Sequence, residues 1–424
     1  MPNQTSLIQL QLWLARPDVE TFPLDAVIAE LRRVGKHFAG SELLAALAEA
    51  RAALPEGADA LRRFLNTALD KHDRRFDNPT YLALHDLPLP TTAGRCPLDT
   101  TSAEQQRDRL IMLLVVDVLR FEIAAHDGTS ELLPLMRPSA RTTAKRCALG
   151  LRVLRTAMTR LGIDVVSDTD DPIETARQLC ARIEPTAEER RMLAVTLLTV
   201  YTAHDEYLFV RMLQCYETTF SLVTVHLRAA IIAARAGDAV RTTRALRAAA
   251  SAMDEASPLF SLVATMQPEA FMTFRDYTDG ASAIQSRSYK TIESLCRRPD
   301  GERLTGPGYD AVPDVRARVL AGQPTLEHTL AQSSLSPNEL ADVRAAMAAF
   351  EAEVMGWRKT HHNLAMRMLG MRRGTGYTAG VPYLAESKDI PLFKCPFAEG
   401  HRAHERGERP ARTGSSAGPT TFPA

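Results

Sequence analysis

The 424-residue sequence has no excess of charge of either sign, because Lys and Arg together number 51 and Asp and Glu also number 51. Nucleic-acid-binding proteins usually carry a basic excess, so the charge balance gives no support for a nucleic-acid partner. Long apolar runs are also missing. The longest, from Leu110 to Leu119, is interrupted by Asp117 and is far shorter than a membrane span. We therefore expect no binding to nucleic acid and no membrane insertion.

Cysteine pairs at metal-binding or redox spacing are absent as well. The six cysteines are scattered with no Cys-x-x-Cys pair: Cys96, Cys147, Cys180, Cys215, Cys296 and Cys395. In a chain of this length, that scatter indicates reduced thiols in a cytoplasmic protein, most of them buried as small apolar side chains. The N-terminal residues MPNQTSLIQLQLWLARPDVE lack a basic start before the apolar residues, so we expect no signal peptide.

Alternation of apolar and polar residues, the pattern of a half-buried strand, is nearly absent, whereas Ala, Leu and Arg recur at spacings of three and four. The sequence therefore predicts an all-α fold, a helical bundle. Capping boxes predict three helix starts. They are Ser102 with Gln105 for a helix to about Ala125, Thr186 with Glu189 for one to about Gly237, and Ser336 with Glu339 for one to about Gly370.

The chain divides into three predicted parts. Residues 1–185 form an N-terminal helical region of unknown role, and residues 186–400 form a helical core. Residues 401–424 have almost no apolar content, so we expect a disordered tail.

Two adjacent histidines lie in the middle of the segment WRKTHHNLAMRMLGMRRGTGYTAG, residues 357–380. On a helix, His361 and His362 point about 100° apart, so both cannot face one site. A neutral imidazole on a rigid helix suits the axial position of a haem iron. A helix histidine is nevertheless more often an exposed side chain, or one whose hydrogen bonds are satisfied, than a ligand.

The glycine-rich part of this segment, residues 368–380, would let the backbone approach a ligand closely. The hydroxyls of Thr375 and Thr378 would then be available for hydrogen bonds. The alternative is an ordinary helix C-cap followed by a flexible turn.

A third candidate is PEAFMTFRDYTDGASAIQSRSYKTIES, residues 268–294. Arg275 can offer a bidentate fork to a carboxylate, and Phe271 and Phe274 could wall an aromatic substrate. The alternative is a surface pair of Arg275 with Asp276 beside ordinary core aromatics.

Together these segments resemble one family. FRDYTDGASAIQS, residues 274–286, is similar to the tryptophan 2,3-dioxygenase pattern of Phe-Arg-Asp, a Ser-containing turn and Gln-Ser, with Ile292-Glu293 at the family's spacing. WRKTHHNLAMRMLGMRRGTG, residues 357–376, resembles its Trp-Arg-x-x-His, Met-Arg, Gly and Arg-Gly-Thr-Gly elements. HDEYLFVRMLQCYE, residues 204–217, is similar to its His-Asp-Glu-x-Leu-Phe stretch ending in Glu. With three blocks in the family's order, the chain is identified as a member of this superfamily.

The resemblance implies that the core over residues 186–400 binds haem, with His361 as the axial ligand of the iron and His362 away from the site. It implies that Arg275 pairs with the substrate carboxylate and that Thr375 binds the substrate amino group. Pocket-wall positions fall on Phe209 and Phe271. Further contacts with the haem are expected from Trp357, Ser282, Gly374, Gly376 and Tyr377.

The sequence departs from the family at three places. Leu213 stands where tryptophan-cleaving bacterial members have a distal histidine, so no side chain there can hydrogen-bond an indole nitrogen. The turn reads GTGYTAG where the family has Gly-Ser-Ser after its Gly-Thr-Gly, so Tyr377 adds bulk and a phenol near the haem edge. Residues 1–185 are also much longer than the family's short N-terminal arm and do not match it.

These features predict a haem-dependent oxygenase of an aromatic L-amino acid: tryptophan, tyrosine or a methylated derivative. Ring hydroxylation in a specialised natural-product pathway, with O₂ or H₂O₂ as oxidant, is the favoured reaction. One alternative is tryptophan 2,3-dioxygenase activity, which cleaves the indole ring to N-formylkynurenine. Another is a non-catalytic haem-binding sensor or scaffold whose partner-binding half is the N-terminal region.

The expected cofactor is non-covalent haem b. One hydroxylase type of this superfamily attaches its haem through a His-x-x-x-Cys motif, and the sequence has none: His401 and His404 are followed by no cysteine, and Cys395 precedes them. His401 as a sixth iron ligand is a minor alternative. The resemblance also implies a homo-oligomer, a dimer or a tetramer.

Overall fold

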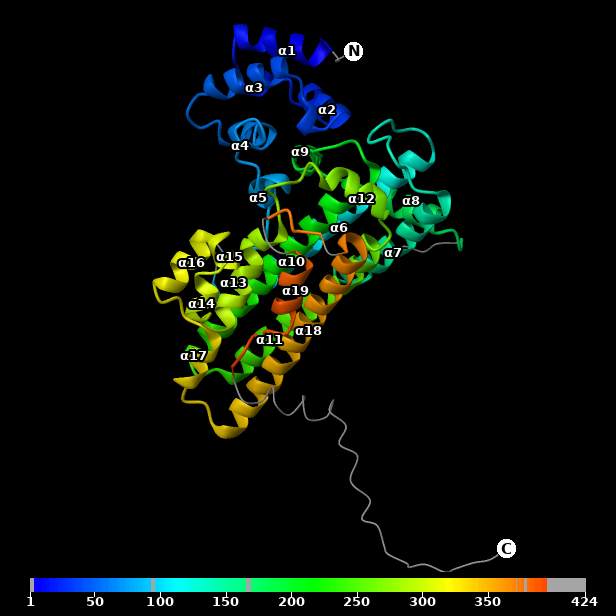
Figure 1. Cartoon of the computed structure of the whole chain (residues 1–424). Helices are drawn as coiled ribbons and strands as arrows, with labels where there is room; N and C mark the ends of the chain where they lie inside the picture. The colour runs from blue at the N-terminus through cyan, green and yellow to red at the C-terminus, as the bar shows by residue number, and fades with distance from the viewer. Residues whose placement is uncertain (1–3, 93–95, 165–168, 371, 377–379, 395–424) are drawn as a thin grey trace, which may run out of the picture.

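The computed structural model describes residues 4–92, 96–164, 169–370, 372–376 and 380–394 (Figure 1). Regular structure in these ranges consists of α-helices and short 3₁₀ turns, without strands, apart from a single bridge between Leu135 and Ala203. The predicted all-α fold is confirmed. In the described ranges no helix has the length and apolar composition needed to cross a bilayer.

The α-helices are, in chain order, α1 (Gln4–Ala15), α2 (Leu24–Val34), α3 (Ser41–Ala52), α4 (Asp59–Ala68), α5 (Asn78–Tyr81), α6 (Thr101–His126), α7 (Ala140–Arg160), α8 (Pro172–Arg182), α9 (Ala187–Val195), α10 (His204–Arg235), α11 (Ala239–Val263), α12 (Pro268–Arg275), α13 (Arg287–Cys296), α14 (Gly301–Leu304), α15 (Pro307–Asp310), α16 (Pro313–Leu320), α17 (Leu326–Ala331), α18 (Pro337–Leu369) and α19 (Val381–Lys388).

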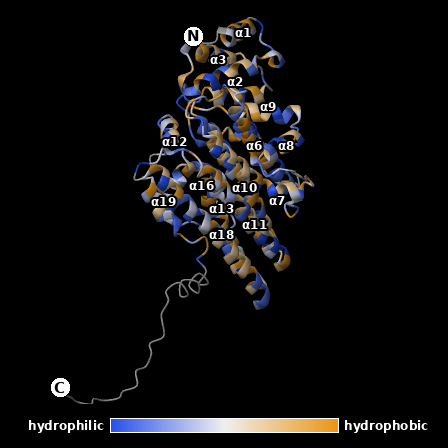
Figure 2. Ribbon diagram, turned by 90° about the vertical axis from the view of Figure 1, so that its right-hand side faces the viewer, coloured by the Kyte–Doolittle hydropathy of each residue, from blue (hydrophilic) through white to orange (hydrophobic). Residues whose placement is uncertain are grey.

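Four long helices form the body of the molecule. α10, with 32 residues, packs along α11 and α6, and α18, with 33 residues, packs against α11 and α19. In Figure 2, α10, α11 and α18 run side by side. α10 is buried on nearly every side, as expected for a helix at the centre of a bundle. This central helix carries Phe209 and Leu213 of the predicted site, and α18 carries Trp357 and His361.

The first four helices pack around a small core of their own, at the top of Figure 1. It joins the rest of the chain through Val195 and Leu198, and through a hydrogen bond of 2.8 Å from the Lys36 backbone amide to the Thr199 carbonyl. A fully buried ion pair of Lys36 and Asp70, 2.6 Å between Nζ and Oδ2, links the segments that follow α2 and α4. Helices α6, α7 and α8 share the large core with α10, α11 and α18. The boundary at residue 185 stays a prediction, although this packing favours a division near residue 70. Residues 401–424 lie outside the described residues.

Two of the three predicted capping boxes are present. Thr186 with Glu189 caps α9, and Ser336 with Glu339 caps α18, which ends at Gly370 with φ of 59°. The box at Ser102 is wrong, because α6 begins one residue earlier and has no side-chain cap.

The predicted helix from Thr186 to about Gly237 is also wrong, because it is broken between Val195 and His204. The carboxylate of Glu206 accepts hydrogen bonds from the amides of Val200 (2.6 Å) and Tyr201 (3.0 Å). The carbonyl of Thr199 accepts one from the amide of Lys36 (2.8 Å). Backbone groups that a continuous helix would pair internally therefore find partners elsewhere.

The expectation for the cysteines holds for four of them, since Cys147, Cys180, Cys215 and Cys296 are buried thiols. Burial raises the pKa of the Cys215 thiol to about 12, so it stays protonated. Cys96 is exposed, and Cys395 lies outside the described residues.

A buried network of charges joins α6, α7 and α10. Arg146 donates to Glu122 Oε1 at 2.7 Å and to Asp205 Oδ1 at 2.6 Å, and all three side chains are fully buried. The second carboxylate oxygen of Asp205 accepts from the amide of Gln267 at 2.7 Å, directly before α12. The network therefore fixes the start of the helix that ends with Arg275.

Replacing Arg146 with Met is expected to lower the free energy of unfolding by about 3–5 kcal/mol, because Glu122 and Asp205 would be left buried without their cation. Arg177→Met is the matched control. Arg177 pairs with Asp127 at 2.9 Å on the exposed surface, where a pair contributes about 0–1 kcal/mol. Urea unfolding measures both variants, and equal losses would contradict the expectation.

Candidate functional site

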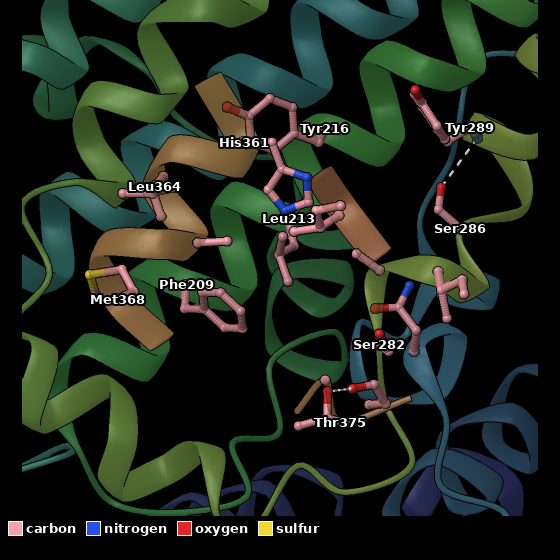
Figure 3. Close-up of a pocket in the computed structure, with 18 of the residues that line it drawn as sticks. Phe209, Leu213, Tyr216, Ser282, Ser286, Tyr289, His361, Leu364, Met368 and Thr375 are labelled. Atoms are coloured by element: carbon pink, nitrogen blue, oxygen red, sulfur yellow. Dashed lines mark hydrogen bonds between the residues drawn. The ribbon is translucent and has the colours of Figure 1, made fainter. Parts of the chain in front are cut away.

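A cavity of about 280 Å³, called here the central cavity, lies among α10, α11, α12, α18, α19 and the segment 281–293 (Figure 3). Its walls are mainly aromatic and aliphatic. The structure brings together most of the residues that the sequence predicted for the site: Phe209, Leu213, Phe271, Arg275, Ser282, Trp357, His361, Gly374 and Thr375.

Gly376 is not part of the cavity wall but packs behind it. A Cβ at this position would lie 2.5 Å from Cβ of Ser282, so only glycine allows the turn to approach that residue. Tyr377 and Thr378 lie outside the described residues. Of residues 368–380, the structure places Met368, Leu369, Gly374, Thr375 and Gly380 at the cavity.

One face of α10 forms a wall of the cavity. Phe209, Leu213, Tyr216, Glu217 and Phe220 follow one another at helical spacing and all line it. Figure 3 shows Phe209 and Leu213 among the residues that line the cavity. The residue at the family's distal position therefore does face the cavity, and its side chain can neither donate nor accept a hydrogen bond.

On α18 the two histidines separate as helix geometry requires. His361 lines the cavity and His362 does not. The imidazole of His361 lies 5.1 Å from the Trp357 ring and 6.4 Å from the Phe260 ring. Burial, with a smaller effect of His362, lowers the pKa of His361 to about 4. The ring is therefore neutral at physiological pH and keeps a lone pair for a metal.

The opposite end of the cavity carries Arg275 and Thr375. Arg275 is half-buried at the end of α12, and its guanidinium donates to the carbonyl of Arg373. The Thr375 hydroxyl donates to the carbonyl of Ala281 at 2.5 Å, and the Thr375 carbonyl accepts from the Gly280 amide at 3.0 Å. The two segments that the sequence singled out are thus tied together.

The alternative of a surface pair between Arg275 and Asp276 does not occur. Asp276 is exposed, and the described residues contain no ion pair between the two. Burial lowers the pKa of Arg275, since the guanidinium is partly desolvated. A desolvated cation beside a cavity favours the binding of an anion.

The residues around His361 fit a haem. In the part of the chain that the structure describes, no three His, Cys, Asp or Glu side chains gather as ligands for a bare metal ion. The porphyrin of a haem already supplies nitrogen ligands to the iron, so the protein needs to provide only an axial ligand and flat apolar walls. His361 offers the first, and Phe220, Phe260 and Trp357 contribute to the second. The buried Nε1 of Trp357 also has no hydrogen-bond partner among the described residues, which leaves a donor for a ligand.

Sequence reasoning missed a wall of the cavity contributed by Asn78, Tyr81 and Leu82. The backbone N–H of Asn78 donates to Gln285 Oε1 at 2.9 Å, and Tyr81 Oη donates to Glu206 Oε1 at 3.1 Å. These residues lie in the region of unknown role before residue 185. The sequence does contain a local indication of a helix here, because Asp77 and Thr80 form a capping box at the start of α5.

Sequence reasoning also gave no role to Glu217, which is 4% exposed and whose Oε2 has no hydrogen-bond partner among the described residues. Burial raises the pKa of this carboxyl to about 7, against the effect of Ser286 and Ser288. The cavity wall therefore contains a carboxyl group that holds its proton through most of the acidic range.

This raised pKa predicts that Glu217→Gln stabilises the protein at neutral and alkaline pH. The unfolded chain releases the Glu217 proton near pH 4.5 and the folded chain only near pH 7, so wild-type stability falls as pH rises through this window. The loss reaches up to about 3 kcal/mol and then levels off. Urea unfolding from pH 4.5 to 8 should show a growing advantage of the variant, and a constant difference would contradict this.

No family model matches the sequence. Among curated proteins, the chain is 24% identical over 234 residues to a tryptophan 2,3-dioxygenase of Xanthomonas campestris pv. campestris, covering 45% of this chain and 76% of the relative. It is 27% identical over 232 residues to one of Ruegeria pomeroyi (45% and 82%) and 25% identical over 227 residues to one of Paraburkholderia phytofirmans (45% and 74%). This similarity and the all-helical fold support membership of the chain in the tryptophan 2,3-dioxygenase superfamily.

Proposed function

We propose that this chain is a haem-dependent oxygenase of an aromatic L-amino acid that adds one oxygen atom to the aromatic ring. The observation that carries the proposal is a single cavity with a neutral imidazole, His361, on one wall and a cation, Arg275, at one end. The relatives named tryptophan 2,3-dioxygenase support the oxygenase class.

Arg275 and Thr375 are suited to hold the backbone of an amino acid. The guanidinium can pair with the carboxylate of the substrate. The Thr375 hydroxyl uses its hydrogen toward Ala281, so its oxygen lone pairs can accept from the substrate ammonium group. The side chain of the substrate would then extend toward Phe209 and Phe271, whose ring centres lie 5.5 Å apart at 65°.

A haem bound at His361 would supply the oxygen chemistry. The protein contributes position: two groups fix the substrate backbone, aromatic walls fix the ring, and reaction becomes effectively intramolecular. Leu213, which lines the same cavity as His361, offers no group that could remove a proton from an indole nitrogen or a phenol (Figure 3). This favours attack on a ring carbon without a protein base from that position.

The second candidate is cleavage of the indole ring of tryptophan to N-formylkynurenine, which the names of the relatives favour. The two reactions differ in stoichiometry. Ring cleavage places both atoms of O₂ in the product and needs no outside electrons. Hydroxylation by O₂ places one atom in the product and consumes two electrons and two protons to release water, and hydroxylation by H₂O₂ releases water without a reductant.

The deciding experiment incubates the haem-loaded protein with tryptophan, tyrosine and their ring-methylated forms. Each is tested with ¹⁸O₂, with and without ascorbate, and with H₂¹⁸O₂. A product that gains one labelled oxygen supports hydroxylation, and a doubly labelled N-formylkynurenine supports ring cleavage. Tight haem binding with no product and no spectral response to any of these amino acids would support the sensor alternative and overturn the enzyme.

Two further features belong to this proposal: haem b held without a covalent bond, and a homo-oligomer. Extraction with acidified organic solvent should release all of the haem from the loaded protein. Light scattering should give the mass of a dimer or tetramer of the 46.7 kDa chain.

A further inference from the structure

His361 lacks the contact that usually orients a metal-binding imidazole. Such a ring commonly donates its second N–H to a carboxylate, a carbonyl or water, which fixes the plane of the ring. Neither ring nitrogen of His361 has a hydrogen bond or an ion pair with another described residue, and only burial and the neighbouring His362 affect its pKa. The orientation of the imidazole must therefore come from packing and from the helix that carries it.

The packing partner of His361 is Trp357, one turn earlier on α18. Their ring centres lie 5.1 Å apart at 42°. Trp357 also lies against Tyr289 of α13, with 5.3 Å between ring centres at 33°. Tyr289 in turn accepts a hydrogen bond on its hydroxyl oxygen from Nε of Arg358 at 2.6 Å. The position of the tryptophan ring is thus linked to the next residue of its own helix.

Arg358 is 6% exposed and makes hydrogen bonds to three other segments of the chain. Nη2 donates to Glu293 Oε1 on α13 at 2.7 Å. Nη1 donates to the carbonyls of Ser387, at 3.4 Å, and Ile390, at the end of α19 and beyond it. One guanidinium therefore ties α18 to α13 and to the C-terminal segment that closes the cavity.

Glu293, the acceptor of this contact, is held from three sides. Besides Arg358 it accepts from Lys290 at 2.8 Å and from Arg303 at 2.8 Å. Although burial opposes ionisation, Lys290, Arg358 and Arg303 lower the pKa of Glu293 to about 2. The carboxylate is therefore charged at neutral pH, where it can anchor the Arg358 guanidinium.

Arg358 and His361 are three residues apart on α18, which places them about 60° apart around the helix axis. At the radius of the side chains, a helix rotation of 10° moves a ring by about 1 Å. Any relaxation of the Arg358 contacts that rotates α18 would therefore displace His361 by an amount that matters for metal ligation.

We infer that Arg358 is a positioning residue: through Glu293, Tyr289 and the carbonyls after α19, it fixes the rotation of α18 and with it the plane of the His361 imidazole toward a bound haem. The inference rests on the proposed haem site. In this view the orientation of the His361 ring depends on the Arg358 guanidinium, which acts through other residues of the protein.

The test compares Arg358→Met and Arg358→Lys with a matched control, Arg303→Met. The control removes a cation from the same carboxylate, and among the described residues Arg303 makes no side-chain hydrogen bond or ion pair with α18. Each protein is titrated with haemin, and the Soret band and the iron–histidine stretch of the ferrous protein are recorded. Thermal unfolding of each variant establishes the temperature range in which it is folded.

We expect Arg358→Met to bind haemin about 10–100-fold more weakly, with a shifted or split iron–histidine band, as is typical when a residue that supports a metal ligand is lost. Arg303→Met should keep the wild-type spectrum and an affinity within about twofold, and Arg358→Lys, which keeps the charge, should lie between them. If Arg358→Met does not fold, the lysine variant decides.

A wild-type spectrum in the folded Arg358 variants would overturn the inference. Equal spectral shifts in Arg303→Met and Arg358→Met would also overturn it, because the charge on Glu293, and not the anchoring of α18, would then be responsible. Absence of any haem band in the wild-type protein is a distinct result, since it would remove the proposed haem site itself and the inference with it.

Discussion

Replacement of His361 by alanine is expected to abolish or strongly shift the Soret band that wild-type protein should show after supplementation with haem. Among the cavity-lining residues that the structure describes, His361 is the single imidazole, and its lowered pKa of about 4 keeps it unprotonated at neutral pH. A haem without this axial ligand would lose the bond between the protein and its iron. The measurement is the visible spectrum of both proteins after removal of unbound haem.

His362→Ala is the control for this experiment, because the neighbouring histidine shares the same helix turn but does not line the cavity. It should retain the wild-type spectrum. Added imidazole should restore an axial ligand in His361→Ala and return a band near the wild-type position. An unchanged spectrum in His361→Ala would show that haem, if bound, is ligated elsewhere.

Replacement of Arg275 by alanine is expected to raise KM for the amino-acid substrate at least about 30-fold, with a smaller effect on kcat. Loss of one partner of a buried charged hydrogen bond costs about 2–5 kcal/mol, and Arg275 is half-buried, so the lower end applies. Steady-state kinetics with the best substrate from the product assay measures the change. Arg275→Lys keeps the charge but loses the planar fork, so its KM should lie between those of the wild type and Arg275→Ala.

A substrate analogue without the carboxylate separates this effect from a general disturbance of the cavity. The wild-type enzyme should bind the decarboxylated amine poorly, and Arg275→Ala should bind it no worse than wild type does. If the variant weakens the amine as much as the amino acid, Arg275 supports the shape of the cavity and the carboxylate is held by another residue.

Helix α18 shows how much the sequence could predict. Its start at Ser336, its end at Gly370 and the separation of His361 from His362 all follow from local rules of capping and helical spacing. That Arg275 and Thr375 line the same cavity could be predicted only from the family resemblance, because no local pattern relates residues 100 positions apart.

The break between α9 and α10 and the wall at Asn78 and Tyr81 could not be predicted in this way. The first depends on Lys36, whose backbone meets Thr199 far along the chain, and on the carboxylate of Glu206. The second depends on Gln285, which holds the Asn78 amide. Such tertiary partners override local helix preference and leave no periodic trace in the sequence.

The cavity wall is held together by residues that lie far apart in the sequence, and this has a consequence for how the protein folds. The hydrogen bond from Asn78 to Gln285 spans 207 residues and that from Tyr81 to Glu206 spans 125. The entropy of closing such long loops must be lost before these contacts contribute any stability, and contacts of this kind slow folding. The cavity is therefore expected to be among the last parts to form, after the local helices. A haem would then be captured by an almost finished protein and would not act as a template for its early collapse.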